Sequence, residues 1–328
     1  MHTAFNNEVK TYGDPALLNR IAWDARWACR EKSISYASAA LKLASEGDST
    51  RARCHRGLAL LTLSWQSKWR GHFDDAMEQA LKVEELLSEK DHPRERAQTY
   101  SILAVVHYSR NRLDLARCSA ERGIELVDQK SGGNAYVDLL TTLASIERYK
   151  GDRSSAGLLL GRAGETAKGA ELARVEQNVA RWMLADNSPI GGLEHAETAL
   201  KLAIRHKNRV VNPYVHEIAG ACLVALKDFG AAEKHFAKGM KLADTDCDDR
   251  ARCQITQHQA RMERTRGNLE KARDLFLKGA KLSKELDYSL WDQFYARALA
   301  DVFETLGDLD QALKYHKRAW TLSEARRT

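Results

Sequence analysis

Proline, long apolar runs and paired cysteines are scarce in this sequence of 328 residues. It contains four prolines, and because proline breaks helix interiors, this scarcity favours long helices. No stretch approaches eighteen uncharged apolar residues, so we expect no membrane-spanning helix. The first ten residues lack the apolar core of a signal peptide. The six cysteines form no CxxC pair, which indicates reduced thiols of a cytoplasmic protein.

Clustered charge and catalytic motifs are also missing. The sequence has 51 basic and 45 acidic residues, and the net charge of +6 is spread along the chain. Nucleic-acid-binding proteins usually carry a clustered basic stripe, so we expect no nucleic-acid contact. There is no HExxH motif, and the glycine pair Gly164 and Gly169 lacks the lysine and the preceding strand of a phosphate loop. We therefore predict no cofactor, no metal ion and no catalysis by these residues.

What the sequence does contain is a repeat of about forty residues. One set of mostly small residues is spaced by 40, 40, 36, 40, 40 and 40 positions: Ser64, Ala104, Ala144, Ala180, Gly220, Ala260 and Ala300. A second set follows each member by twelve positions, or once by sixteen: Ala76, Ala116, Ala156, Ala196, Ala232, Ala272 and Ala312. A fixed period of this size is typical of a solenoid, in which each unit stacks on the next.

Each unit divides into two amphipathic helices, because apolar residues recur three and four positions apart on either side of a turn. A third set of residues follows late in the second helix: Val83, Gly123, Ala163, Ala203, Gly239, Gly279 and Ala319. Glycine within a helix costs roughly 1 kcal/mol relative to alanine. Its recurrence here therefore predicts a close helix–helix contact at this position.

The turn pattern Gly-x-(Leu/Phe)-x-x-Ala, as in 267–272 and 307–312, together with these small residues, resembles the tetratricopeptide repeat (TPR). TPR units are about 34 residues long, so the longer period predicts helices extended by a partial turn. The resemblance covers roughly residues 15–325, and segment 17–44 fits an eighth, shortened hairpin. It implies an all-α fold: a right-handed TPR-like superhelix of about eight helical hairpins.

The regularity changes once, between Ala180 and Ala196, where the gap is sixteen instead of twelve. We interpret segment 186–192 as an insertion in the turn. It predicts an N-terminal half, 1–187, and a C-terminal half, 188–328, of the same superhelix with a softer joint between them. A simple surface insertion is the alternative interpretation.

In TPR superhelices the first helix of each hairpin usually lines the inner groove. By helical phase, the predicted groove residues for a ligand or partner are Gln98, Ser101, Tyr108, Asp138, Thr141, Arg148, Tyr149, Gln177, Arg181, Tyr214, Glu217, Gln254, Gln257, Arg261, Arg264, Phe294 and Arg297. Aromatic and arginine side chains are favoured in recognition surfaces, and arginine suits carboxylates. We therefore expect the arginines to make the main contacts. An ordinary solvated helix face is the alternative for each residue.

The opening segments, 17–26 and 35–44, are similar to sensory repeat regions of bacterial signalling proteins, such as TPR-containing diguanylate cyclases. The resemblance implies a non-catalytic protein-interaction and sensory module that regulates an output domain, most simply a fused diguanylate cyclase beyond residue 328. Residues 321–328 continue the helical pattern without a stop signal, as expected for a helix that leads into another domain. The alternatives are a freestanding scaffold or adaptor and a peptide-binding regulator. The expected partner is a protein or peptide in the concave groove, and a homodimer remains open.

Overall fold

The computed structural model describes residues 13–324, so the N-terminal segment 1–12 and the last part of the C-terminal run, 325–328, lie outside the described residues. Within this range the chain forms sixteen α-helices and no strand, which confirms the all-α prediction. Consecutive helices pack in pairs: α2 (Pro15–Ala25) with α3 (Arg30–Ala44), α4 (Thr50–Arg70) with α5 (Phe73–Leu86), α6 (Pro93–Ser109) with α7 (Leu113–Leu126), α8 (Gly133–Lys150) with α9 (Arg153–Thr166), α10 (Ala170–Ala185) with α11 (Pro189–Arg205), α12 (Asn212–Ala225) with α13 (Phe229–Thr245), α14 (Asp249–Thr265) with α15 (Leu269–Glu285), and α16 (Ser289–Thr305) with α17 (Leu309–Glu324). No helix in the described range is long and apolar enough to cross a membrane.

The small residues lie where neighbouring helices approach each other, either within a pair or between successive pairs. The Ser64 hydroxyl on α4 donates a hydrogen bond to the Ala76 carbonyl on α5, 2.6 Å away. A Cβ atom added at Gly279 would lie 2.2 Å from the Tyr295 hydroxyl, and one at Gly123 would lie 2.6 Å from Leu139. The close contacts predicted at the third set of small residues are confirmed at these two glycines.

Three-residue turns join the helices of the last four pairs, at 186–188, 226–228, 266–268 and 306–308. The middle residue of each turn has a left-handed backbone, including Gly267 at φ 85° and Gly307 at φ 82°. Glycine adopts this conformation without a steric penalty. The side chain of Asp228, in the second of these turns, caps α13 by accepting a hydrogen bond from the Ala231 amide at 3.0 Å, which satisfies one of the free N–H groups at a helix start.

The structure corrects the expected insertion at 186–192. Residues 189–192 form the first turn of α11, and the loop before them has the same length as the three loops that follow in later pairs. Gly192 is the fourth residue of α11, as Ala232 is of α13 and Ala272 of α15, and it lies twelve positions after Ala180. The chain is therefore four residues shorter before Ala180 than in the other repeats. With Gly192 in place of Ala196, both sets of small residues advance by 36 positions here instead of 40. The predicted division at residue 187 falls in this turn and stays a prediction.

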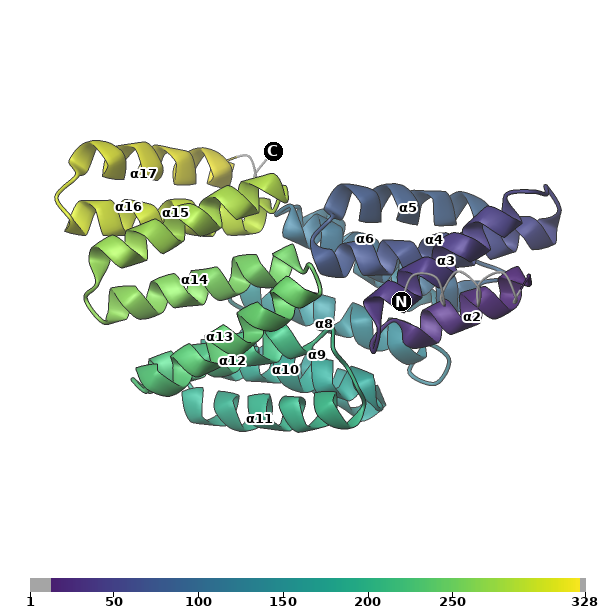
Figure 1. Ribbon diagram of the computed structural model, residues 1–328, viewed down its shortest axis with the longest axis horizontal. Coiled ribbons are helices and arrows are strands. Elements are labelled where there is room, and N and C mark those ends of the chain that lie inside the picture. The colour runs from purple at the N-terminus through teal and green to yellow at the C-terminus, as the bar shows by residue number, and fades with distance from the viewer. Residues whose placement is uncertain (1–12, 325–328) are drawn as a thin grey trace.

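The first helices of successive pairs contact one another from α2 to α14 and form the inner layer of the superhelix. Solenoid repeats normally contact only their neighbours, but here α4 also contacts α14, and α6 contacts α16. Figure 1 shows the yellow-green C-terminal pairs returning toward the blue α5 and α6. The superhelix thus closes on itself.

Specific polar contacts hold this closure. Arg30 on α3 forms an ion pair with Asp248 at 3.3 Å, and the Arg209 amide donates to the Trp27 carbonyl at 2.9 Å. The Tyr149 hydroxyl donates to the Gln293 side-chain oxygen at 3.1 Å, across 144 positions of sequence. Residues from both ends of the chain therefore enclose the inner face.

Candidate functional site

The closed inner face contains cavities where the sequence predicted an open groove. One of them, the main cavity, has a volume of about 640 Å³. It lies among α6, α8, α10, α12, α14 and α16, and its lining includes Arg148, Tyr149, Arg181, Arg261, Trp291 and Phe294. A smaller central cavity of about 120 Å³ is lined by Lys68, Asp138, Arg174, Gln177, Gln254 and Tyr288 among others, and it adjoins the main cavity through Arg148 and Arg181.

Glu217 provides the negative charge beneath the main cavity. Its carboxylate receives both arms of the Arg181 guanidinium, at 3.2 and 2.5 Å, and lies 2.6 Å from the His258 ring. Burial alone would raise the pKa of Glu217, but the charges of Arg181 and His258 outweigh burial and lower this pKa to about 2. Glu217 is therefore ionised at neutral pH and balances the charge of Arg181.

Two other arginines of the main cavity lack such a partner. Among the described residues, neither Arg148 nor Arg261 forms an ion pair with a carboxylate. Burial lowers the pKa of both guanidinium groups, because an arginine in a poorly hydrated site is costly to keep charged. The rings of Tyr149, Trp291 and Phe294 also line this cavity. Its chemistry is therefore that of an aromatic pocket with excess positive charge, suited to an anionic ligand.

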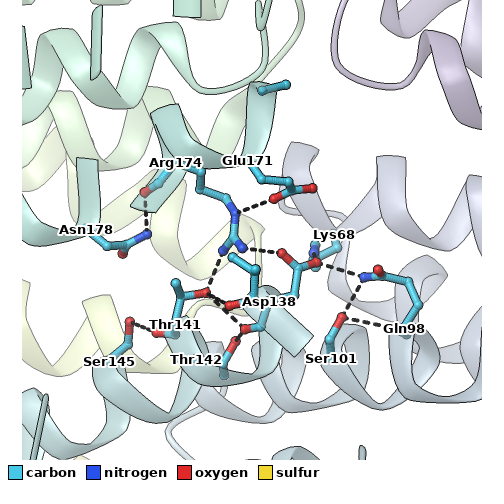
Figure 2. Close-up of polar contacts among 12 residues, drawn as sticks. Lys68, Gln98, Ser101, Asp138, Thr141, Thr142, Ser145, Glu171, Arg174 and Asn178 are labelled. Carbon is cyan, nitrogen blue, oxygen red and sulfur yellow. Dashed lines mark hydrogen bonds and ion pairs between the residues drawn. The ribbon is translucent and has the colours of Figure 1, made fainter. Parts of the chain in front are cut away.

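Asp138 organises the wall of the central cavity (Figure 2). Its carboxylate lies 2.5 Å from Arg174 and 3.8 Å from Lys68. It also accepts a hydrogen bond from Gln98 at 2.8 Å. Arg174 donates in addition to the Thr141 hydroxyl at 2.6 Å. One carboxylate thus joins side chains from α4, α6, α8 and α10.

Glu171 extends this network toward the N-terminal hairpin. It lies 3.3 Å from Arg174 and 3.8 Å from Arg26. Burial, followed by the nearby Asp138 charge, raises the pKa of Glu171 to about 7. Burial also lowers the pKa of Lys68 to about 8, although Asp138 opposes this change. The network therefore contains two groups that titrate near neutral pH.

The structure brings most of the predicted groove residues together around these cavities. The main or central cavity is lined by Tyr108, Asp138, Thr141, Arg148, Tyr149, Gln177, Arg181, Tyr214, Gln254, Gln257, Arg261 and Phe294. Gln98 lines a third cavity, Ser101 hydrogen-bonds to Gln98, and Glu217 lies beneath the main cavity. Arg264 and Arg297 line none of these cavities. The role of each residue in binding stays a prediction.

Sequence reasoning missed Lys68 and Arg174, although the repeat carried the signal for both. Arg174 follows Asp138 by 36 positions, the same step that separates Ala144 from Ala180, and it precedes Tyr214 by 40. Lys68 precedes Tyr108 by 40. Both residues therefore occupy, in their own repeats, the positions that correspond to predicted groove residues in neighbouring repeats. Within residues 13–324, no three His, Cys, Asp or Glu side chains gather in a way that could hold a metal ion.

Comparison with solved structures identifies the architecture. A Rap protein complexed with competence and sporulation factor superposes with a TM-score of 0.65 at 13% identity, covering 95% of this chain and 98% of that chain. The Rap conjugation gene regulator of the plasmid pLS20, in complex with the Phr* peptide, gives a TM-score of 0.66 at 11% identity over 95% of both chains. The chain folds as a TPR superhelix.

A further TPR structure, Cut9 with Hcn1 from the APC/C, has a TM-score of 0.52 at 14% identity and covers 98% of this chain and 71% of that chain. Neither a family model nor a curated protein matches the sequence. At these identities the likeness establishes the TPR fold alone.

Proposed function

We propose that this TPR superhelix is a protein-interaction module that binds an acidic segment of a peptide or partner protein in the main cavity. The observation that carries the proposal is the pair of arginines without ion-pair partners, Arg148 and Arg261, in a cavity with aromatic walls. A ligand carboxylate would replace the hydration that each guanidinium loses on burial. Arginine suits this role because its planar fork binds a carboxylate through two parallel hydrogen bonds.

The aromatic side chains support a peptide as the source of the carboxylate. Tyr149, Trp291 and Phe294 offer apolar area at low conformational cost, and such residues often dominate binding energy. Two proteins of similar overall architecture, the Rap protein and the pLS20 regulator, are complexed with competence and sporulation factor and with the Phr* peptide, respectively. These likenesses support a peptide over a small metabolite in the main cavity.

The finer proposal is that binding regulates a signalling output domain, with a fused diguanylate cyclase beyond residue 328 as the first candidate. The main cavity takes Arg148 from α8 and Arg261 from α14, so an occupant would bridge the two halves predicted on either side of residue 187. A ligand can shift the equilibrium between a closed and an open superhelix only if its affinities for the two forms differ. The intact mass of the protein in its source cells tests this step, since a mass well above 36.9 kDa is expected if an output domain follows.

The binding proposal is tested with short fluorescent peptides that alternate acidic with aromatic residues, compared with charge-reversed peptides in which lysine replaces each acid. We expect the acidic peptides to bind, and the double variant Arg148→Ala plus Arg261→Ala to lose about tenfold or more in affinity, because hydrogen bonds to charged groups contribute about 1.5–3 kcal/mol. Fluorescence anisotropy measures both effects.

The matched control is Arg264→Ala. Arg264 also lies on α14, pairs with Asp301 at 3.6 Å and lies outside the cavities, so its loss should leave peptide affinity unchanged. Equal binding of acidic and charge-reversed peptides, or full affinity in the double variant, would contradict the proposal.

A further inference from the structure

A third cavity, the N-terminal cavity, lies outside the site proposed for peptides. Its volume is about 480 Å³, and it is formed by α2, α4, α6 and the segment 130–135 that leads into α8. It shares no lining residue with the main cavity. The Gln98 side chain, in its wall, donates to Asp138 of the central cavity at 2.8 Å. The polar network around Asp138 therefore lies between the N-terminal cavity and the other two.

The N-terminal cavity has an apolar interior of ligand size. Trp23 on α2, Leu58 and Leu61 on α4, and Ala135 on α8 line it, and Leu61 and Ala135 are buried in the fold. Pockets for small organic molecules usually have volumes of about 300–1,000 Å³ and are mostly apolar with a few placed polar groups. The size and lining of this cavity fit that description.

Two residues of the lining, Asn19 and His55, carry polar atoms without partners. Asn19 is 5% exposed, and its amide nitrogen donates to the His55 carbonyl at 2.9 Å. This bond fixes the orientation of the amide and leaves its oxygen buried without a hydrogen-bond partner. Both ring nitrogens of His55 are likewise buried and unpartnered. Buried polar atoms in folded proteins are nearly always hydrogen-bonded. The Asn19 oxygen and the unprotonated ring nitrogen of His55 can each accept a hydrogen bond, which indicates a ligand that carries a donor.

The rim of the cavity is positively charged. Arg20, Arg94 and Lys130 line it on exposed segments, and none of the three forms an ion pair within the described part of the chain. Glu95 supplies the acidic side chain of the lining. The balance of charge therefore favours an anion whose apolar body enters the cavity.

We propose that the N-terminal cavity is a second binding site, for a small aromatic carboxylic acid that carries a hydrogen-bond donor on its ring. The ring packs against Trp23 and Leu61, and its donor bonds to the Asn19 amide oxygen or the His55 ring. The carboxylate remains at the rim beside Arg20 and Arg94. This site does not depend on peptide binding in the main cavity.

The test is calorimetric titration of the full chain with indoleacetate, which has a ring N–H donor and one carboxylate. We expect saturable binding, at least about fivefold weaker binding of the matched alcohol indole-ethanol, and a similar loss in the variant Arg20→Gln plus Arg94→Gln. Asn19→Leu should weaken binding by about tenfold, because it removes the acceptor for the ring donor. Circular dichroism checks that each variant remains folded. If Asn19→Leu does not fold, the variant Arg20→Gln plus Arg94→Gln provides the test, because both of its positions are exposed.

Arg148→Ala plus Arg261→Ala is the control that separates the two sites. We expect it to bind indoleacetate as the unmodified chain does, even if it has lost peptide affinity. The proposal is overturned if indoleacetate does not bind at millimolar concentration, if the rim variant binds it unchanged, or if the main-cavity variant abolishes its binding.

Discussion

Lys68 shows how a single residue in this protein depends on distant repeats. It is buried on α4, close to the rings of Trp65 and Trp69 and 3.8 Å from Asp138 on α8. One carboxylate is shared between Lys68 and Arg174, which is 2.5 Å from the same group. The cost of removing the ammonium group from water is thus incompletely offset, which agrees with the lowered pKa of Lys68.

A pH-dependent stability follows at this residue. The pKa of Lys68 is about 8 in the folded chain, compared with an ordinary value of 10.5. Between these values the unfolded chain binds more protons, so the contribution of Lys68 to the free energy of unfolding rises with pH. We expect the stability of the unmodified chain relative to Lys68→Met to increase by about 2 kcal/mol between pH 7 and pH 10.

Urea unfolding of both proteins at each pH measures this difference. The Cys222 and Cys253 thiols, whose pKa values burial raises to about 12, act in the opposite direction, but they are common to both proteins and cancel. An identical pH dependence in the two proteins would show that Lys68 does not titrate in this range.

At the scale of the element, close approach between helices decides which small residues are required. Gly279 on α15 faces the Tyr295 ring on α16, whereas Gly161 on α9 has open space where a Cβ would lie. The sequence shows both simply as glycines within helices. Their neighbours in the adjacent helix give them opposite roles.

Alanine substitution should therefore have opposite effects at these two positions. Gly279→Ala is expected to lower the free energy of unfolding by about 1–3 kcal/mol, because the added carbon would lie 2.2 Å from the Tyr295 hydroxyl. Gly161→Ala should raise it by about 0.5–1 kcal/mol, because alanine loses less backbone entropy than glycine when the helix forms. Urea unfolding at neutral pH gives both values, and stabilisation at Gly279 would contradict the close packing.

For the whole molecule, the contacts of α4 with α14 and of α6 with α16 close the superhelix, so that its inner face becomes largely enclosed. Arg30 bonds to the Asp246 carbonyl at 2.8 Å and to the Asp248 carboxylate at 3.3 Å, more than 200 positions away. Asp248 in turn accepts a hydrogen bond from Tyr214 at 2.9 Å, and the Tyr214 hydroxyl oxygen lies 3.3 Å from the Trp69 carbonyl. These contacts connect α3 and α4 to α12 and α14, so the N-terminal helices and the α12–α14 region should unfold together.

Arg30→Ala tests this closure. Removing one member of a buried ion pair typically costs about 3–5 kcal/mol, because the remaining charge stays desolvated. We expect a loss of about 3 kcal/mol in the free energy of unfolding and a larger radius of gyration by small-angle X-ray scattering. Arg122→Ala, which breaks exposed pairs with Glu89 and Glu125, should change neither property. An unchanged radius in Arg30→Ala would mean that the other contacts hold the closure without it.

The sequence by itself determined the helical hairpins, since the apolar period, the turn residues and the recurring small residues all act between neighbours in the chain. It also placed Tyr108, Arg148 and Arg261 on the inner face, because helical phase fixes which side a residue occupies. The predicted insertion at 186–192 is wrong because an alanine pattern cannot show that Gly192 fills the alanine position. Only the tertiary structure decided the closure of the superhelix, the charge balance that leaves Arg148 without a carboxylate, and the N-terminal cavity. These depend on contacts between residues far apart in the chain, whose spacing follows no period, and the curvature that brings them together is the sum of many small rotations between repeats.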